Sequence, residues 1–359
     1  MNRRLVFVSA TGNVSGAEVV LLNLIHEALQ RGLHVRCACP PGDLADRLPA
    51  DVEHVEIEEQ GLGTGPKPLA AIGLGAAARR ASQILSRCSH DADAVVVNGF
   101  LALPAIRLAK MASPVSWVVH DVLRKADWFA VLRVVRSALT MAIPVSQAAA
   151  APLRARGIPV TVVPNGVRWP VPARISPPDE PVVGCVALLT PWKGHLSLLD
   201  AFAQVQTPGA RLELAGSHFP KDANYVQDLH ARAARSDLAG KVTFLGRVDT
   251  LATMRTWTLG VSSSIEPEAM PLVVLEALSV GLPMITTALG GSLEIIGHGG
   301  GWLVPPSDPP SMATAIDGLL GDKGEQQRLA AWGPAQIAAS YQLDYQVARQ
   351  LDAVAGGPW

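Results

Sequence analysis

The feature that most constrains the fold is a repeated alternation of short, valine-rich apolar runs with longer amphipathic stretches. Polar residues do not interrupt the apolar runs at every second position, which is typical of parallel strands covered by helices on both faces. Amphipathic stretches such as Ala17–Arg31 and Leu69–Arg87 predict helices between several of the runs. In the first half the expected strands are Leu5–Ser9, His34–Cys39, Val52–Ile57, Ala94–Asn98, Val115–Val119, Met141–Val145 and Val160–Val163. This pattern predicts a doubly wound α/β domain.

The second half of the chain repeats this rhythm. Its expected strands are Val182–Ala187, Arg211–Ala215, Val242–Leu245, Gly260–Ser262 and Met284–Thr286. Its expected helices are Leu196–Gln204, Tyr225–Ser236, Leu272–Val280 and Ser311–Leu320, followed by a final helix from Gln336 to Val354. The predicted fold class is therefore α/β, with two Rossmann-like domains built on parallel sheets.

The densest proline stretch of the chain separates these halves, from Trp169-Pro170-Val171-Pro172 to Pro181. Prolines fix φ and interrupt regular pairing, so this stretch predicts a linker. A chain of 359 residues accommodates two domains. We expect an N-terminal domain at 1–168, a linker at 169–181, a C-terminal domain at 182–335 and a helix at 336–359 that packs back toward the N-terminal domain. Because ligands bind beyond the carboxyl ends of such strands, we expect the site in the cleft between the domains.

Charge and hydropathy exclude several classes of protein. The formal net charge is −1, which is no signature of a nucleic-acid-binding protein. No apolar stretch reaches the roughly 20 residues that span a bilayer. The opening MNRRLVFVSA is too short an apolar run for a signal peptide and suits a first buried strand. These features predict a cytoplasmic protein.

The stretch from Ser263 to Leu278 carries the most chemical information, because it leaves a strand and opens a helix. Pro271 suits a first helical turn, where its missing N–H is not needed. The N–H groups of Leu272 and Val273 then have no helical partner and suit phosphate oxygens. Glu276 lies about one turn further, within reach of a ribose diol, and Glu268 precedes the helix. An ordinary amphipathic helix with a solvated glutamate at each end would also fit this stretch.

Three further residues are expected at the carboxyl ends of strands. Gly16, like Gly12 before it, follows the first strand and would let the backbone approach a ligand, although a plain turn fits as well. His120 ends an apolar strand, where a purely structural role is the alternative. Lys193 follows a strand and a Thr-Pro-Trp turn, so its ammonium is either a neutralising charge for a leaving diphosphate or a surface group.

Seven residues separate Glu268 from Glu276, and this spacing resembles the E-x7-E signature of the retaining glycosyltransferase family 4, which has the GT-B fold. The resemblance runs in order along nearly the whole chain. Its other blocks are Ser15-Gly16-Ala17-Glu18, Val119-His120-Asp121, Val145-Ser146, Pro164-Asn165-Gly166-Val167, Pro191-Trp192-Lys193-Gly194-His195, Gly246-Arg247-Val248-Asp249 and Gly290-Gly291-Ser292-Leu293-Glu294. This ordering makes the resemblance more specific than any single block.

The resemblance implies a glycosyltransferase that moves a sugar from a UDP- or GDP-sugar to a hydroxyl acceptor with retention of anomeric configuration. The acceptor, whether a lipid, a polysaccharide or a small metabolite, would bind the N-terminal domain. The implied catalytic residues are His120, Glu268 and Lys193. The implied donor-binding residues are Gly16, Lys193, Arg247, Val248, Met270, Pro271, Leu272, Val273 and Glu276. No Asp-x-Asp pair occurs in a suitable loop, so no metal and no cofactor besides the nucleotide sugar is expected.

The chain departs from the family pattern at two places. The family usually has an arginine about five residues before the lysine of the Lys-Gly block, and here the stretch Val186-Ala187-Leu188-Leu189 holds no cation. Either Lys193 acts alone on the diphosphate or another residue such as Arg247 substitutes. The family's common Phe-Gly is Met270-Pro271 here, which leaves phosphate binding by the backbone intact and changes the sugar pocket.

Competing interpretations remain for the activity and for one surface. The same architecture serves nucleotide-sugar epimerases, which need no acceptor, and a non-catalytic nucleotide-binding scaffold would also fit the missing arginine. A basic, aromatic stretch formed by Arg124, Lys125, Trp128, Phe129, Arg133 and Arg136 follows His120. It predicts either a peripheral contact with the inner face of an anionic membrane or a helix that covers the N-terminal sheet with its arginines in solvent.

Overall fold

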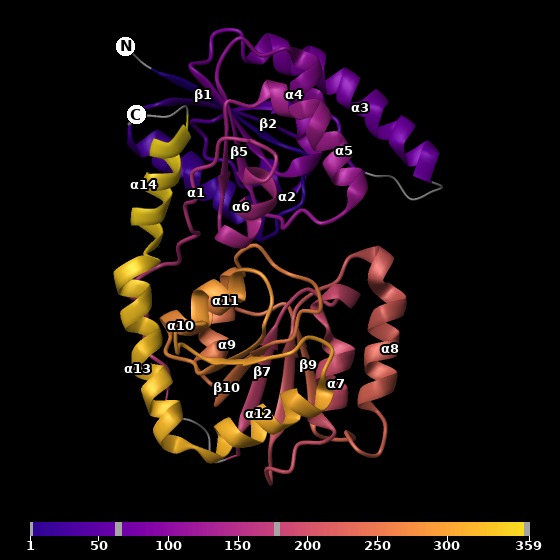
Figure 1. Cartoon of the computed structure of the whole chain (residues 1–359), viewed down its shortest axis with the longest axis vertical. Coiled ribbons are helices and arrows are strands. Elements are labelled where there is room, and N and C mark those ends of the chain that lie inside the picture. The colour runs from indigo at the N-terminus through magenta and orange to yellow at the C-terminus, as the bar shows by residue number, and fades with distance from the viewer. Residues whose placement is uncertain (1–2, 62–66, 176–179, 355–359) are drawn as a thin grey trace. The chain divides into compact units, whose positions relative to one another are not determined.

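A computed structural model gives the fold of the chain and describes residues 3–61, 67–175 and 180–354. The chain divides into two compact units. Unit 1 comprises Met1–Asn165 together with Asp344–Trp359, and unit 2 comprises Gly166–Leu343. Each unit contains one six-stranded parallel sheet with helices around it (Figure 1).

In unit 1 the strand order across the sheet is β3-β2-β1-β4-β5-β6. The strands are β1 (Arg4–Ser9), β2 (His34–Cys39), β3 (Glu53–Glu56), β4 (Ala94–Asn98), β5 (Val115–Val119) and β6 (Met141–Pro144). The helices are α1 (Gly16–Gln30), α2 (Asp43–Asp46), α3 (Lys67–Cys88), α4 (Leu103–Ala109), α5 (Ala126–Val135), α6 (Gln147–Arg154) and the C-terminal α14 (Leu343–Ala353), with short 3-10 turns at Phe100–Ala102 and Arg136–Ala138. Strands β4 and β5 are buried along their whole length, as expected for a sheet covered on both faces.

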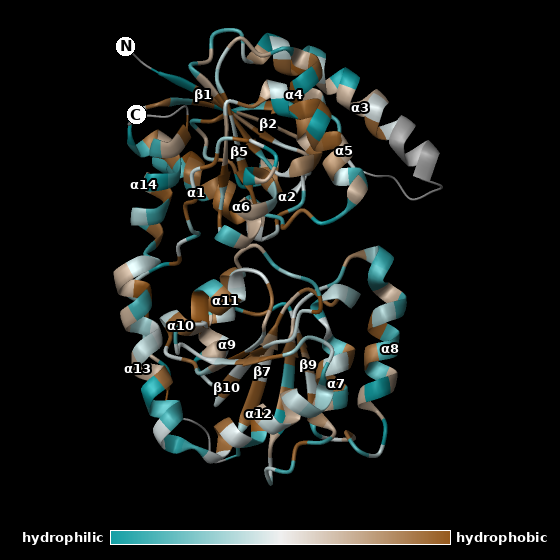
Figure 2. Cartoon of the chain, in the orientation of Figure 1, coloured by the Kyte–Doolittle hydropathy of each residue, from teal (hydrophilic) through white to brown (hydrophobic). Residues whose placement is uncertain are grey.

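In unit 2 the order is β12-β11-β10-β7-β8-β9. The strands are β7 (Val182–Val186), β8 (Arg211–Ala215), β9 (Val242–Gly246), β10 (Leu259–Ser262), β11 (Met284–Thr287) and β12 (Trp302–Val304). The helices are α7 (His195–Phe202), α8 (Ala223–Ala233), α9 (Thr250–Met254), α10 (Leu272–Ser279), α11 (Gly291–Ile296), α12 (Pro309–Gly321) and α13 (Lys323–Ser340), with 3-10 turns at Pro191–Lys193 and Pro220–Asp222. Figure 2 shows hydrophobic residues on β7 and α10 and more hydrophilic ones along α8 and α13.

The predicted fold class is confirmed, since both units are doubly wound parallel α/β folds. In unit 1 the chain builds β1 to β3 in one direction and then returns to place β4 on the other side of β1. In unit 2 it builds β7 to β9 and then places β10 on the other side of β7. Each sheet therefore has a topological switch point, between β1 and β4 and between β7 and β10, where such folds bind ligands.

Some expected elements differ from those observed. The run Val160–Val163 is not a regular strand; it meets β6 only through an isolated bridge and two hydrogen bonds, one of them from the Thr161 N–H to the Ala142 carbonyl (3.1 Å). Prolines on both sides of this run withhold the N–H groups that a longer ladder needs. The sequence prediction also missed β12, a three-residue strand that follows three glycines.

The single helix expected from Gln336 to Val354 is wrong, because the chain breaks it into α13 and α14. Val167 pairs with the segment between them: its N–H donates to the Tyr341 carbonyl (2.9 Å), and its carbonyl accepts from the Leu343 N–H (2.8 Å). Helix α13 belongs to unit 2, while the residues from Asp344 onward belong to unit 1. There Gln350 donates to the Val163 carbonyl (3.3 Å).

The described part of the proline stretch lies on unit 2. The Arg174 N–H donates to the Val280 carbonyl (3.0 Å), and the Ile175 N–H donates to the Arg255 carbonyl (3.1 Å). The chain passes from unit 1 to unit 2 after Asn165, a few residues before the predicted start of the linker at 169. Residues 176–179 of the predicted linker lie outside the described residues.

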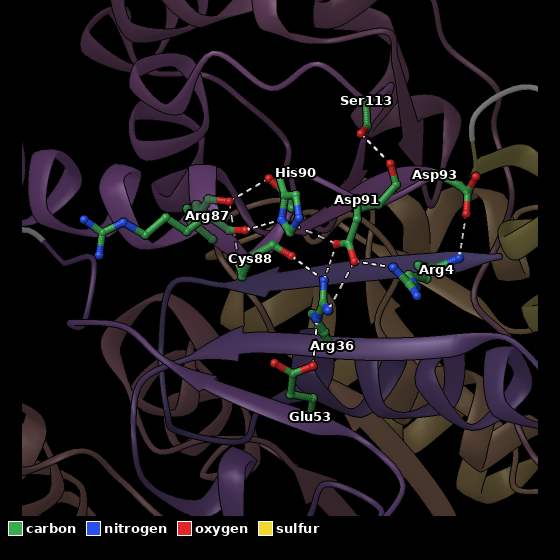
Figure 3. Close-up of polar contacts among 12 residues, drawn as sticks. Arg4, Arg36, Glu53, Arg87, Cys88, His90, Asp91, Asp93 and Ser113 are labelled. Carbon is green, nitrogen blue, oxygen red and sulfur yellow. Dashed lines mark hydrogen bonds and ion pairs between the residues drawn. The ribbon is translucent and has the colours of Figure 1, made fainter. Parts of the chain in front are cut away.

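A charged network joins the strands of unit 1 toward the amino-terminal edge of the sheet (Figure 3). The Asp91 carboxylate accepts from both Arg4 and Arg36, and Arg36 Nε also donates to Glu53 (2.7 Å). The hydrogen bond from Arg36 lowers the pKa of Asp91 to about 2. Because this network lies away from the carboxyl ends of the strands, we assign it a structural role.

Candidate functional site

Lys193 and Glu268 meet at the switch point of unit 2. Lys193 ends the turn that follows β7, and Glu268 lies in the loop between β10 and α10. Lys193 Nζ lies 2.5 Å from Glu268 Oε2, and the two side chains are only 12% and 13% exposed. The Ser264 hydroxyl donates to the other oxygen, Glu268 Oε1 (2.5 Å). Two of the predicted catalytic groups, the Lys193 ammonium and the Glu268 carboxylate, therefore contact each other in one cluster with Ser264.

Glycines allow the surrounding loops to approach this cluster. A Cβ on Gly194 would lie 2.1 Å from the Ser263 carbonyl oxygen, and one on Gly290 would lie 2.2 Å from the carbonyl oxygen of Glu268. Both residues have positive φ, +72° and +52°, a conformation that glycine adopts without a steric penalty. The Gly291 N–H also donates to the Glu268 carbonyl (2.8 Å). Two sequence blocks far apart in the chain therefore fix the main chain on either side of the ion pair.

Helix α10 begins at Leu272, four residues after Glu268. Pro271 is the N-cap of the helix, one position earlier than the first-turn place predicted for it, and the Val274 N–H donates to its carbonyl (3.1 Å). Leu272 and Val273 are the first two helical residues, so the helix supplies no acceptor for their N–H groups. Met270 is buried beside them. The arrangement suits an anion bound by main-chain donors and the helix dipole.

Glu276 lies in the second turn of α10 and is half-buried. Burial raises the pKa of its carboxyl group to about 7. In these partly desolvated surroundings, a ligand that donates hydrogen bonds to the carboxylate stabilises its ionised form. Glu276 is therefore poised to accept from hydroxyl groups.

Arg247 and Val248 follow β9, which is two strands away from β7 across the sheet. The Arg247 side chain is exposed, and Val248 is half-buried. The two predicted cations thus have different surroundings. Lys193 is paired with the Glu268 carboxylate, whereas Arg247 is an exposed residue that follows the edge strand β9.

In unit 1, His120 follows β5 and contacts Asn98, the last residue of β4. His120 Nε2 lies 2.8 Å from Asn98 Oδ1. Asn98 Nδ2 in turn lies 3.5 Å from Oε1 of Glu18, a buried residue in the first turn of α1. Burial lowers the pKa of the His120 imidazole to about 4, so the ring is neutral at neutral pH.

The two predicted glycines after β1 have different settings. Gly12 is buried, and a Cβ there would lie 2.3 Å from the Pro41 carbonyl oxygen, so close backbone packing explains this glycine. Gly16 is the exposed first residue of α1, behind the N-cap Ser15. Of the two glycines, Gly16 is the exposed one, and exposure is what a loop that approaches a ligand requires.

The basic, aromatic stretch after His120 forms α5 and its flanks. The Trp128 ring stacks on Phe100 with centroids 5.4 Å apart, and the Arg156 guanidinium lies 3.5 Å from the centre of the Phe129 ring. Both aromatic rings therefore pack within unit 1, while Arg124, Arg133 and Arg136 are exposed. Among the residues that the structure describes, no helix is both long and apolar enough to cross a bilayer.

The sequence prediction assigned no role to Asn98, Glu18 or Ser264. Asn98 was expected only as the end of a strand, and its partner His120 lies one strand further along the chain. The Ser15-x-x-Glu18 spacing is a capping-box signal, which points to a helix start and not to a site. Ser264 precedes Glu268 by four residues in a loop, and no regular periodicity relates the two.

Two doubly wound units in one chain, each with polar groups at its switch point, define the GT-B class of fold. Consistent with this class, the structure resembles that of HepE from Anabaena, solved with UDP and glucose, with a TM-score of 0.81 and 23% identity over 98% of this chain and 99% of that one. The model of glycosyltransferase family 4 matches residues 14–168, and that of glycosyl transferases group 1 matches residues 172–335. The chain therefore belongs to family 4, the group 1 glycosyltransferases, as its motifs predicted.

Curated relatives match part of the chain. It is 30% identical over 172 residues to a GDP-mannose-dependent monoacylated alpha-(1-6)-phosphatidylinositol monomannoside mannosyltransferase of Corynebacterium glutamicum, covering 45% of this chain and 43% of that one. It is 32% identical over 169 residues to a D-inositol 3-phosphate glycosyltransferase of Mycobacterium marinum, covering 46% of this chain and 36% of that one. The matches thus span less than half the length of either relative.

Proposed function

We propose that this protein transfers a sugar from a nucleoside diphosphate sugar to a hydroxyl acceptor, with retention of anomeric configuration and without a metal ion. The observation that carries the proposal is the Lys193–Glu268 pair, in which Glu268 lies in the loop that leads into α10. An ammonium group, two N–H groups for which the helix supplies no acceptor, and a carboxylate that can accept from hydroxyl groups, Glu276, match the parts of such a donor. Family membership supports the same activity.

On the donor side, the N–H groups of Leu272 and Val273 would hold the diphosphate, together with Lys193. Glu276 would accept hydrogen bonds from the ribose diol, and Glu268 would lie near the transferred sugar. Main chain at Arg247 and Val248 would border the base. In unit 1, Gly16 is proposed as a donor-binding residue and His120 as a catalytic residue. Positive charge and N–H donors stabilise the negative charge that develops on the leaving diphosphate, which accounts for a reaction without a metal.

In the proposed step, the bond between the anomeric carbon and the phosphate oxygen breaks, and its electron pair stays on the diphosphate. The acceptor oxygen forms a bond to the same carbon from the same face, and its proton passes to a phosphate oxygen. Configuration is thereby retained without a covalent glycosyl–enzyme intermediate. Proton NMR of the first product tests this step, because an inverted anomeric centre would contradict it.

The relatives suggest where substrate screens should start. Names among them specify GDP-mannose as donor and phosphatidylinositol mannoside or inositol phosphate as acceptor, and HepE was solved with UDP. We therefore propose a GDP- or UDP-sugar as donor. Calorimetric titration of UDP, GDP, ADP and TDP without metal, repeated with Glu276→Ala, identifies the base. We expect one diphosphate to bind and the variant to lose about 1.5–3 kcal/mol of binding free energy.

Turnover with and without an acceptor separates the proposed transferase from its alternatives. A transferase releases free nucleoside diphosphate in proportion to added acceptor. An epimerase converts the nucleotide sugar without any acceptor, and a scaffold binds the nucleotide without turnover. Addition of a chelator completes the test, since the proposal requires activity to be unchanged.

A cytoplasmic location with peripheral contact to an anionic membrane remains part of the proposal for the acceptor side. Its support is the exposed cations Arg124, Lys125, Arg133 and Arg136 around α5. Flotation with vesicles that contain an anionic lipid tests it, with Arg124→Glu/Lys125→Glu as the variant. Equal flotation of the two proteins would contradict the proposed contact.

A further inference from the structure

Three polar side chains from separate elements form a chain of hydrogen bonds at the switch point of unit 1. Glu18 belongs to α1, Asn98 ends β4 and His120 follows β5. Glu18 and Asn98 are only 5% and 2% exposed. Asn98 Oδ1 lies 2.8 Å from His120 Nε2, and Asn98 Nδ2 lies 3.5 Å from Glu18 Oε1. Polar groups this deeply buried are held in place by such contacts.

The hydrogen-bond donors around Glu18 determine which groups donate and which accept along this series of hydrogen bonds. The Ser15 N–H donates to Glu18 Oε2 (3.0 Å), and the Ser15 hydroxyl lies 2.5 Å from the same oxygen. The Asn98 amide faces the other oxygen, so both oxygens accept from N–H groups, as a carboxylate does.

A carboxylate beside Asn98 decides how the amide is oriented. The NH2 group turns toward Glu18, and the carbonyl oxygen Oδ1 is left for His120. The opposite orientation would bring the amide oxygen against the carboxylate, and two acceptors would then face each other without a proton between them. Since Oδ1 only accepts, the proton of this contact belongs to the imidazole.

We infer that Asn98, oriented by Glu18, holds His120 in the tautomer that carries its proton on Nε2 and leaves Nδ1 as a hydrogen-bond acceptor. Asn98 and Glu18 are positioning residues, because they act through the imidazole ring. In this tautomer Nδ1 accepts from a hydroxyl group and cannot donate to a phosphate oxygen. His120 thus recognises a hydroxyl of the sugar or of the acceptor, and only this last step rests on the proposed function.

The ring remains in this state at neutral pH. Burial lowers the pKa of His120, so that the imidazole carries one proton and its tautomer is defined. Glu18 lies beside Asn98, and Asp121 follows His120 in the chain; desolvation and the charge of Glu18 raise the pKa of the Asp121 carboxyl group. The carboxylate of Glu18 therefore reaches His120 through an amide and not by direct contact.

The experiment is a long-range proton–nitrogen NMR correlation on the whole protein labelled with 15N-histidine, at pH 7 and without substrate. The His120 signals are assigned by their loss in His120→Gln. We expect the pattern of a neutral ring protonated at Nε2. A ring protonated at Nδ1, or a doubly protonated ring, overturns the inference. Because this measurement needs no substrate, its failure is distinguishable from a failure of the proposed transferase activity.

Two variants test the positioning role. Asn98→Leu removes the acceptor, and Glu18→Gln removes the charge that orients the amide while keeping the size of the side chain. We expect both to convert the His120 signals to a mixture of tautomers and to lower kcat roughly 10- to 100-fold, with a smaller change in the KM for the donor. An unchanged Nε2–H pattern in both folded variants overturns the roles of Asn98 and Glu18.

Ser9→Ala is the matched control. Ser9 is buried at the end of β1 and lies opposite Asn98 in the sheet register. This substitution removes a buried hydroxyl from the same place without touching the chain of hydrogen bonds. We expect the wild-type tautomer and a kcat within about twofold of wild type, which corresponds to less than about 0.5 kcal/mol. A tautomer change in Ser9→Ala as large as that in Asn98→Leu would attribute the effect to general disturbance of the sheet edge and overturn the inference.

Discussion

Lys193 Nζ lies 2.5 Å from Glu268 Oε2, and these two residues come from loops that follow neighbouring central strands, β7 and β10. The pair is largely buried, so its two charges compensate each other in the protein without substrate. A diphosphate that arrives at this place offers Lys193 a second anionic partner while Glu268 stays held by the Ser264 hydroxyl. In the proposed reaction, Lys193 would therefore already be in position for the leaving group before the donor binds.

Replacement of Lys193 is expected to weaken diphosphate binding selectively. A charge-assisted hydrogen bond contributes about 1.5–3 kcal/mol, so Lys193→Met should lower the affinity for the preferred nucleoside diphosphate by roughly 10- to 100-fold. The affinity for the corresponding nucleoside should not change. Calorimetry at low temperature measures both values.

The matched variant is Arg247→Met, which removes the exposed cation at the end of β9. We expect a loss of less than about threefold, which is below about 0.7 kcal/mol. If Arg247→Met lost more affinity than Lys193→Met, Arg247 would be the residue that replaces the family's missing arginine.

Donor binding is expected to depend on the ionisation of Glu276. Burial raises the pKa of this carboxyl group to about 7, and only its ionised form accepts two ribose hydroxyls. The affinity for the nucleoside diphosphate should therefore rise about tenfold between pH 6 and pH 8. The ligand's own phosphate also titrates, so the difference between wild type and Glu276→Gln is the quantity to measure. Parallel pH profiles for the two proteins would argue against Glu276 as the titrating group.

The raised pKa of Glu276 also affects the stability of the ligand-free protein, which should fall with rising pH while donor affinity rises. A carboxyl group whose pKa is raised on folding contributes stability below its unfolded pKa of about 4.5 and loses that contribution as the pH rises through about 7. Glu276→Gln should therefore stabilise the ligand-free protein at pH 8, by up to about 3 kcal/mol, and should have little effect at pH 4. Thermal unfolding at the two pH values measures this, and destabilisation at pH 8 would contradict it.

Close backbone approach at Gly194 should make this position intolerant of any side chain. Gly194→Ala places a Cβ 2.1 Å from the Ser263 carbonyl oxygen at a φ of +72°. We expect a loss of about 2–4 kcal/mol in urea-induced unfolding of unit 2, together with reduced turnover, because the Lys193 turn must move. Gly240→Ala is the control, since φ is +79° there and nothing lies within 4 Å of the added Cβ. Gly240→Ala therefore measures the cost of a positive φ without a steric clash, which we expect to be about 1–2 kcal/mol of unfolding free energy.

Acid should weaken unit 1 through Asp91. Its carboxyl pKa is lowered to about 2 by the hydrogen bond from Arg36. The associated stability is present above the unfolded pKa of about 4 and is lost as the pH falls through about 2. At neutral pH we expect Asp91→Asn to cost about 1–2 kcal/mol, a value reduced for partial exposure to solvent, without any change in donor affinity. Unfolding curves at pH 7 and pH 2.5 test this, since the difference between variant and wild type should shrink at the lower pH.

Local patterns were sufficient for most of the regular structure. Strands Ala94–Asn98, Val115–Val119 and Arg211–Ala215 have the predicted ends. The first two are buried along their whole length and mostly apolar, as parallel strands covered on both faces are. The break between α13 and α14 was not predictable in this way. It depends on hydrogen bonds with Val167, which is more than 170 residues away along the chain.

Sequence alone determined that the chain has two doubly wound units, that it belongs to family 4, that His120, Lys193 and Glu268 follow strands, and that Glu276 lies about one turn into a helix. These properties depend on residue type and short spacing, which a sequence displays directly. Tertiary structure alone decided that Lys193 pairs with Glu268, that Asn98 joins Glu18 to His120, and that the pKa of Glu276 is raised. Contacts and burial of this kind arise only when the strand order brings distant loops to one switch point and removes water from between them.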